Sequence, residues 1–513
     1  MPRLKAAIES GASGILRSTV PPITPAAWTT FLSGKQPGTH GIIDFERYDV
    51  RTNKLQLNTT QCLGHVRNLW QIAGDAGLKV GSVNVPMTYP PTPVNGFLVS
   101  GFETPGPGSD FVYPADLKKE ILARWTDPTS GVNWQRSMFG GDKLFARNVA
   151  YMSRSFHQCA EMTAWLGDKL GWDVLMVVLK LVDNLQHKTW KYLDARWSHR
   201  NRRRNEIAKR GFEELNKAVG KLLDYAAEHH AATIMVSDHG HGSLEGKVHA
   251  NLLLKQWGYL NLQGGGAQEA TRGRHILDRF QGRTKRFARV GGVEHDLAVD
   301  FARTIACVMH AGMAGFLYIN LEGRQPTGVV PAEQYESLRD ELKQRFLGEE
   351  CRVRAPNGES VRLFSEVHKP EELYHCTREQ QPWLPDLLLI PRESLAVVRK
   401  IRGRSAVRWL PYRRIEGTHR PDGILVATGP GIASNIEVHA HIVDCAPTIL
   451  ALLGLRIPDD MEGRVITEIF ESPPTIETEA AQVGEKDSDG GEGYSAEELQ
   501  QVTERLSDLG YLE

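Results

Sequence analysis

The chain has 513 residues, enough for one large α/β domain with inserted segments or for about two to three ordinary domains. Hydrophobic residues make up 41% and charged residues 24%, which is typical of a globular protein. The 61 Lys and Arg nearly balance the 62 Asp and Glu. A formal net charge of -1 therefore gives no electrostatic case for a nucleic-acid or membrane partner.

The sequence shows no sign of secretion or of a membrane span. No apolar run reaches the roughly 18 to 20 residues that cross a bilayer. The N-terminal segment 1–14 has the pattern of an amphipathic helix with a glycine stop, without the apolar core of a signal peptide. The six cysteines form no C-x-x-C pair and suit a reducing compartment. We therefore expect a cytoplasmic protein.

Short aliphatic runs alternate along the chain with longer helical patterns. Several runs are apolar on both faces, as expected of buried parallel strands covered by helices. The segment 212–229 has apolar residues at helical spacing and leads directly into such a run, which is an α-to-β step. The sequence thus predicts an α/β fold with a doubly wound, mostly parallel sheet and helices on both faces. The predicted strands are 78–85, 96–100, 173–180, 232–237, 386–390 and 423–428.

Three changes of composition suggest the domain plan. Residues 1–470 read as the main domain, and 264–345, which is glycine-rich and basic at its start, reads as an inserted cap. Residues 471–494 are rich in Pro, Gly and acidic residues and are predicted to be a disordered linker. In 495–513, Ser495 and Glu498 form a capping box before an apolar stripe, which predicts a C-terminal helix that docks on the domain.

Thr24 precedes Pro25, a pair that marks the start of a helix. A hydroxyl at this position faces the positive end of the helix dipole and free backbone N–H groups, which favour an alkoxide and a bound phosphate. Taken alone, the segment is explained more simply if Thr24 only caps the helix.

Potential metal ligands follow two predicted strands. Asp183 and His187 come after 173–180, and Asp238 and His239 come after 232–237, where open α/β sheets place their sites. His419 lies in a loop before 423–428. It is a candidate ligand only because the other potential ligands occur in the same chain. Mixed oxygen and nitrogen ligands suit zinc or manganese. Two such ions a few Å apart would clamp the attacking and leaving oxygens of a phosphoryl displacement.

These segments together resemble the alkaline phosphatase superfamily, within it the type I phosphodiesterase/nucleotide pyrophosphatase group and its bacterial and archaeal phosphohydrolase or phosphomutase relatives. The resemblance covers essentially the whole chain, in the expected order. Its motifs are TPAAWTTFLSGKQPGTHGI (24–42), NVPMTYPP (84–91), DNLQH (183–187), SDHG (237–240), NLEGRQPTGVV (320–330), GTH (417–419) and LGYL (509–512).

The resemblance implies a role for each of these residues. Thr24 matches the nucleophile, which would form a covalent phospho-enzyme intermediate. One ion, at the first metal site, would be held by Asp183, His187 and His419. The other, at the second metal site, would be held by Asp238, His239 and Thr24. Zinc is the expected metal, with manganese as the alternative, and the expected partner is a small phosphorylated substrate.

One feature of the family is missing from the sequence. Its members begin with a strand that ends in Asp-Gly, and this Asp is a ligand of the second metal site. No such strand precedes Thr24. We expect that the true start lies upstream of Met1 and that the central sheet has a gap. The alternative is a degenerate, non-catalytic member.

The expected activity is hydrolysis of a phosphodiester or nucleotide pyrophosphate through phospho-threonine. A phosphomonoesterase, a phosphonate hydrolase, a phosphomutase or a sulfatase on the same scaffold are alternatives. Thr24 argues against a mutase, which would use serine, and against a sulfatase, which would use the C/S-x-P-x-R signature. His40 and Asp44 are interpreted as parts of a structural turn. His241 and His249 are interpreted as solvated loop residues, with a position facing the substrate as the alternative for either.

Overall fold

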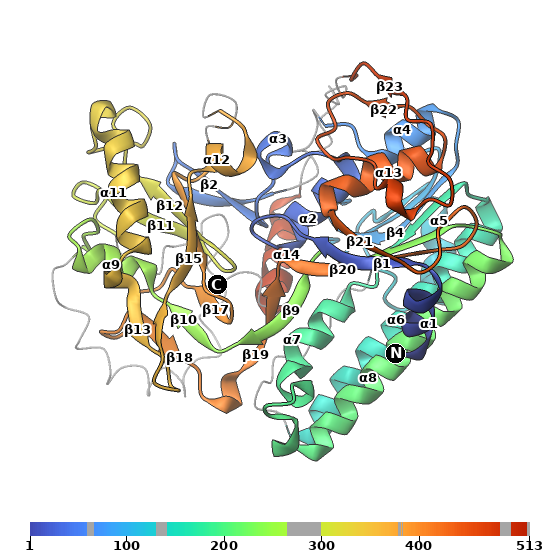
Figure 1. The fold of residues 1–513 in the computed structure, drawn as a ribbon, viewed down its shortest axis with the longest axis horizontal. Coiled ribbons are helices and arrows are strands. Elements are labelled where there is room, and N and C mark those ends of the chain that lie inside the picture. The colour runs from blue at the N-terminus through green and yellow to red at the C-terminus, as the bar shows by residue number, and fades with distance from the viewer. Residues whose placement is uncertain are drawn as a thin grey trace. The chain divides into compact units, whose positions relative to one another are not determined.

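The computed structural model describes residues 1–58, 66–129, 141–263, 299–377, 381, 383–482 and 494–509. The chain divides into two compact units, shown as ribbons in Figure 1. The first unit contains Met1–Phe45, Asn58–Leu244 and Tyr412–Glu513, and the second contains Glu46–Leu57 and Glu245–Pro411. The predicted cap at 264–345 lies in the second unit, and its residues 264–298 fall outside the described part.

Two four-stranded sheets form the centre of the first unit. One has the order β21 (Ile436–His441), β1 (Ala12–Arg17), β20 (Asp422–Thr428), β8 (Thr233–Val236). The other has the order β6 (Val112–Tyr113), β5 (Gly96–Ser100), β4 (Val80–Val85), β7 (Val174–Val177). In the first sheet β20 runs antiparallel to both β1 and β8, whereas β4 is parallel to both β5 and β7 in the second. The α/β class is confirmed, but these strands form two sheets of mixed direction.

All the predicted strands occur. A run that is apolar on both faces is stabilised as a strand when other parts of the protein bury both faces. All six residues of β4 are buried, as are four of the five in β5. The predicted strand at 386–390 is β16 (Leu387–Pro391) in the second unit. The helical pattern at 212–229 is the end of a longer helix, α8 (Arg202–Glu228).

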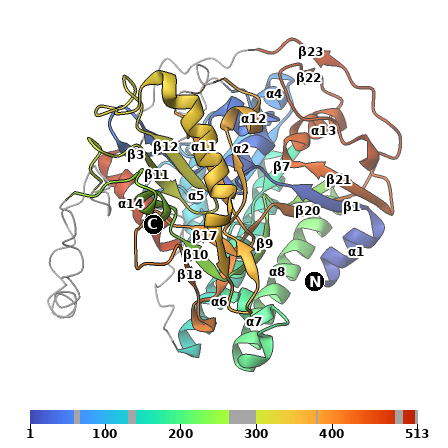
Figure 2. The same ribbon diagram turned by 60° about the vertical axis from the view of Figure 1, so that its left-hand side comes forward.

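Long helices cover the sheets of the first unit. α6 (Asp142–Leu170) and α8 lie side by side, and both pack on α7 (Leu181–Leu193), as Figure 2 shows from a second side. α2 (Thr24–Ser33) is buried along its whole length, so it is a core element rather than a surface helix. No helix in the described residues is long and apolar enough to span a membrane.

The second unit is built mainly from short antiparallel strands. One sheet has the order β11 (Ala306–Ala311), β12 (Gly315–Ile319), β16, β15 (Phe364–His368), and α11 (Tyr335–Leu347) packs on β15. A second sheet joins β17 (Leu395–Val397), β10 (Gly246–Val248) and β18 (Val407–Trp409). The remaining pairs are β13 (Arg352–Arg354) with β14 (Ser360–Arg362), and β2 (Glu46–Asp49) with β3 (Lys54–Leu57).

The C-terminal helix α14 (Ala496–Leu509) docks on the first unit as predicted. Its capping box is present: the Glu498 N–H donates to Ser495 Oγ, and the Ser495 N–H donates to Glu498 Oε2. Val502 and Leu506 are buried, and Arg505 donates to the carbonyl oxygen of Phe102. In the predicted linker 471–494, β23 (Thr478–Glu479) pairs with β22 (Ile457–Pro458), while 483–493 lie outside the described residues.

The buried carboxyl group of Glu103 makes stability depend on pH. Its Oε1 accepts the Met87 N–H at 3.1 Å, whereas Oε2 has no hydrogen-bond partner among the described residues. Burial raises the pKa of Glu103 from 4.5 to about 7, so the folded protein keeps a proton that the unfolded chain loses. Stability should therefore fall as pH rises, by about 3 kcal/mol between the unfolded and folded pKa values.

Glu103→Gln, which mimics the protonated acid, should remove this loss. Urea unfolding of both proteins at about pH 4.5 and about pH 8 measures it. Equal changes in unfolding free energy in the two proteins would show that Glu103 ionises normally in the fold.

Candidate active site

Asp183 and His187 lie on one face of the first turns of α7, directly after β7. Residues four apart on a helix are neighbours, and the two side chains approach to 3.2 Å, from Asp183 Oδ1 to His187 Nε2. The buried Lys180 donates to Asp183 Oδ2 at 2.9 Å. This contact holds one carboxylate oxygen and leaves Oδ1 directed at the histidine.

His419 reaches the same place from β19 (Glu416–Arg420), which pairs antiparallel with β9 (Gly240–Leu244) and lies beside α7 (Figure 1). Its Nε2 is 3.3 Å from Asp183 Oδ1 and 3.0 Å from His187 Nε2. Gly417 permits this approach, since a Cβ there would stand 2.6 Å from the Gln186 carbonyl oxygen. The three residues of the predicted first metal site thus converge.

Hydrogen bonds fix which ring nitrogens carry protons. His187 Nδ1 is 2.7 Å from the Gly417 carbonyl oxygen, and His419 Nδ1 is 2.8 Å from that of Pro22. A carbonyl only accepts, so each Nδ1–H donates, and Nε2 of each ring lies beside Asp183 Oδ1 as a potential ligand atom. Three electron-rich atoms about 3 Å apart repel one another unless a cation lies between them. The donor set therefore fits a divalent metal ion.

Asp238 and His239 repeat this pattern at the end of β8. Asp238 Oδ2 is 3.5 Å from His239 Nε2, and His239 Nδ1 donates to the Gly240 carbonyl oxygen at 3.1 Å. His239 Nε2 is buried and has no hydrogen-bond partner in the described residues. The His239 ring stacks on that of His419, with centroids 3.5 Å apart. The two predicted metal sites are therefore adjacent.

Thr24 is the first residue of α2 and does not cap it. The N-cap is Ile23, and no side chain accepts a capping hydrogen bond. Thr24 Oγ1 is buried and has no hydrogen-bond partner among the described residues. The preceding loop contacts both metal sites, because Ser18 Oγ donates to the Asp238 carbonyl oxygen and Pro22 accepts from His419. Simple capping, the plainer explanation of Thr24, is thus wrong.

Burial sets the protonation of this cluster. Burial and then the charge of Asp183 raise the pKa of Asp238 to about 6. Burial lowers the pKa of His239 and of His419 to about 4, so both rings are neutral ligands at pH 7. Burial opposes ionisation of Asp183, but Lys180, His187 and His419 together outweigh burial and hold the pKa of Asp183 well below its usual range. The carboxyl group of Asp238, buried close to that of Asp183, is a further reason to expect a cation here.

Two histidines that the sequence assigned to solvated loops are buried. His241 lies on β9, and its Nε2 is 3.4 Å from Asp183 Oδ1. It joins Asp183, His187 and His419 in a group whose ligand atoms all lie within 4.8 Å of one another. His249 is buried in the second unit, where its Nδ1 donates to the Lys400 carbonyl oxygen. Those two solvated-loop predictions were wrong. His40, by contrast, holds a turn as predicted, since its Nδ1 accepts the Ile42 N–H.

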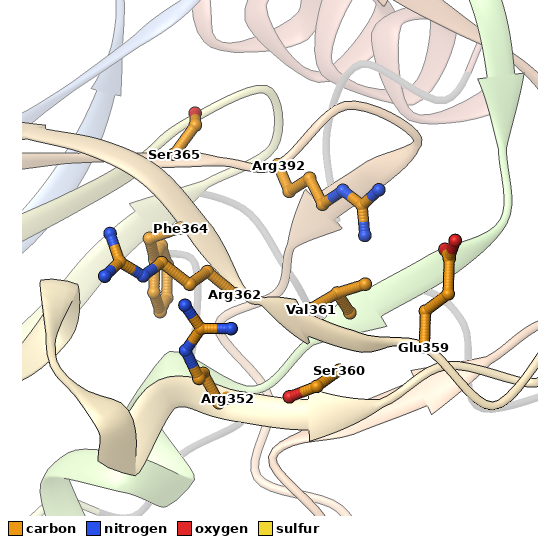
Figure 3. Close-up of a pocket in the computed structure, with 8 residues that line it drawn as sticks. All are labelled: Arg352, Glu359, Ser360, Val361, Arg362, Phe364, Ser365 and Arg392. Carbon is orange, nitrogen blue, oxygen red and sulfur yellow. The ribbon is translucent and has the colours of Figure 1, made fainter.

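The pocket drawn in Figure 3 is a different feature. It is lined only by residues of the second unit, among them Arg352, Arg362 and Arg392, and it contains none of the predicted site residues. Arg352 and Arg362 face each other across the β13–β14 pair. Arg362 and Arg392 are exposed, so this pocket is an open basic surface rather than a buried site.

The sequence profile described as "Type I phosphodiesterase / nucleotide pyrophosphatase" matches residues 1–422. The chain belongs to this family. Among solved structures, the chain is similar to phosphonoacetate hydrolase from Sinorhizobium meliloti 1021 in complex with phosphonoformate. The TM-score is 0.52 at 13% identity, over 87% of this chain and 88% of that one. No curated protein sequence matches.

The family match confirms the resemblance to the type I phosphodiesterase/nucleotide pyrophosphatase group and makes the chain a phosphoric ester hydrolase. At 13% identity, the solved structure supports the fold alone. The roles of individual residues therefore rest on the geometry above.

Proposed function

We propose that the chain is a metal-dependent hydrolase of phosphodiesters or nucleotide pyrophosphates that acts through a phospho-threonine at Thr24. One observation carries this proposal: the rings of His187 and His419, each tethered through Nδ1 to a backbone carbonyl, both place Nε2 beside the same oxygen of Asp183. Asp183, His187 and His419 would hold the first ion, and Asp238 and His239 would hold the second beside Thr24. Zinc suits these oxygen and nitrogen ligands, and manganese is the alternative.

The ions would supply Lewis-acid stabilisation of charge on the transferring phosphoryl group. The chain's own residues do the rest. Thr24 Oγ1 attacks phosphorus, and the bond to the leaving alcohol or phosphate breaks. The hydroxyl is free to do so because it has no hydrogen-bond partner among the described residues. The first turn of α2 presents backbone N–H groups and the positive end of its dipole to the phosphoryl oxygens. Water then hydrolyses the phospho-threonine and restores the hydroxyl.

Metal removal tests the proposal directly. Chelator treatment should reduce hydrolysis of bis-p-nitrophenyl phosphate to about 1% or less, and Zn²⁺ or Mn²⁺ should restore it. The diester should be turned over faster than p-nitrophenyl phosphate and p-nitrophenyl sulfate, which report the phosphomonoesterase and sulfatase alternatives. Full activity in a protein shown to contain no metal would refute the metal-dependent mechanism.

The sheet edges in the first unit support a further part of the proposal. All four residues of β7 and all four of β8 are half-buried, although both strands are apolar. Side chains alternate between the two faces of a strand, so uniform exposure points to an open edge rather than an open face. Val174, Met176, Ile234 and Val236 pack against one hydrophobic core. Long apolar edges of this kind invite pairing with another strand.

The outer edges of the same two sheets are protected. β6 has only two residues, and β21 carries Glu437, His439 and His441 on its exposed positions. Short or charged edges are the usual protection against pairing. This contrast indicates that β7 and β8, unlike β6 and β21, are suited to pairing with a further strand.

We therefore propose that a strand encoded upstream of Met1 fills the space between β7 and β8 and joins the two sheets into one doubly wound sheet. Both strands end at the site, β7 before Asp183 and β8 before Asp238. A strand parallel to them would end there too, and an Asp at its end would complete the second metal site. It would form a β-α-β unit with α1 (Pro2–Ser10) and β1. The reading frame upstream of Met1 tests this: an immediate stop codon would favour a degenerate, non-catalytic member.

The substrate is proposed to be a small phosphorylated molecule. A cytoplasmic location stays a prediction, as does the absence of a nucleic-acid partner.

A further inference from the structure

We propose that His241 is a fourth protein ligand of the first metal site and the one that yields its place to a substrate oxygen. This inference rests on the proposed metal centre and adds a residue to it. The trio of Asp183, His187 and His419 leaves one position open in a tetrahedral site. His241 is the described side chain in place to close it.

The first argument is the number of nitrogens around one oxygen. Asp183 Oδ1 lies 3.2 Å from Nε2 of His187, 3.3 Å from that of His419 and 3.4 Å from that of His241. Because His187 and His419 carry their protons on Nδ1, their Nε2 atoms do not donate to this oxygen, and hydrogen bonds do not account for the cluster. The spacing matches a different arrangement. Four ligands about 2.0–2.1 Å from one ion stand about 3.3 Å apart at the corners of a tetrahedron.

The second argument is the state of the His241 ring. Its side chain is 1% exposed, and neither ring nitrogen has a hydrogen-bond partner among the described residues. A buried imidazole without a hydrogen-bond partner has lost its hydrogen bonds to water. No interaction replaces them unless the ring binds a ligand. Nε2 of this ring lies 3.4 Å from Asp183 Oδ1, which would share the ion.

The third argument separates His241 from the other ligands. The Nδ1 atoms of His187 and His419 are tethered to backbone carbonyls at 2.7 and 2.8 Å, which locks those rings. Nδ1 of His241 has no such tether among the described residues, and its ring contacts those of His187 and His419, with centroids 4.7 and 5.2 Å away. Because its Nδ1 has no hydrogen bond to break, the His241 ring can move at the lowest cost in free energy. It is therefore the ligand that can exchange for a phosphoryl oxygen.

X-ray absorption at the zinc edge tests the inference by counting imidazole ligands. The Asp238→Asn background confines one equivalent of Zn²⁺ to the first metal site. We expect three imidazoles per zinc in the Asp238→Asn protein and two when His241→Ala is added to it. We also expect two in the Asp238→Asn protein saturated with inorganic phosphate. Zinc affinity should fall at least about tenfold in the His241→Ala protein.

The controls separate this inference from the metal centre itself. His157→Ala, a histidine paired with Glu214 elsewhere, should change nothing. His187→Ala should lose most of the zinc affinity, and if it does not, the proposed metal centre fails. If His187→Ala loses affinity while His241→Ala keeps the imidazole count of its parent, His241 is not a ligand. A count of three that persists with phosphate would overturn the exchange.

Discussion

Replacement of Thr24 by alanine is expected to lower the turnover of a diester substrate by about 10³-fold or more, because the attacking oxygen is lost. Metal content should stay the same, since Asp183, His187, His419, Asp238 and His239 all remain. Thr24→Ser keeps the hydroxyl and should retain most of the rate. Steady-state kinetics with bis-p-nitrophenyl phosphate, together with metal analysis of the three proteins, measures the effect.

The same substitution should not destabilise the fold. Thr24 Oγ1 is buried and has no hydrogen-bond partner among the described residues, so its removal leaves no other group unsatisfied. A melting temperature equal to or above that of the parent protein would show that lost activity is not lost structure. Turnover by Thr24→Ala at the parental rate would refute the assignment of the nucleophile.

The second large effect concerns the strand proposed between β7 and β8. A protein extended upstream through its own reading frame should keep two metal ions per chain after dialysis, whereas the chain without the extension should lose the second ion, which has fewer ligands. Asp→Asn at the end of the added strand should lower its turnover by at least about 100-fold, because the second ion loses a charged ligand. Metal stoichiometry and diesterase kinetics, measured side by side on the three proteins, test this.

Hydrogen exchange separates the structural part of that prediction from the catalytic part. The extension should slow amide exchange in 174–177 and 233–236, because the open edges of β7 and β8 gain hydrogen-bond partners. The Asp→Asn protein should show the same protection with little activity. Unchanged exchange in both strands would mean that no strand enters between them.

Local patterns explain how much of the fold could be predicted. The runs that became β4, β5 and β8 are continuously apolar, so period and length sufficed to find them. Asp183 and His187 are four apart on a helix, which made their meeting predictable from spacing alone. The number of sheets could not be predicted in this way, because it depends on which strand edges find partners.

The long-range part of the site lay beyond any local pattern. His419 reaches Asp183 only because β19 pairs with β9 and Gly417 lets the strand approach α7. His419 was predicted as a ligand from the family resemblance, not from its spacing to the other ligands in the sequence. His241 was missed because the segment after Asp238 was interpreted as a loop. His241 lies on β9 directly opposite His419 on β19, and this cross-strand pairing, which no local pattern shows, brings the two rings together.

Anomalous X-ray diffraction from crystals grown with Zn²⁺ tests the central claim most directly. We predict a peak about 2.0–2.1 Å from Nε2 of His187 and of His419 and bonded to Asp183, with any second peak beside Asp238 and His239. Zinc bound only elsewhere on the protein, with these side chains free of metal, would contradict the account.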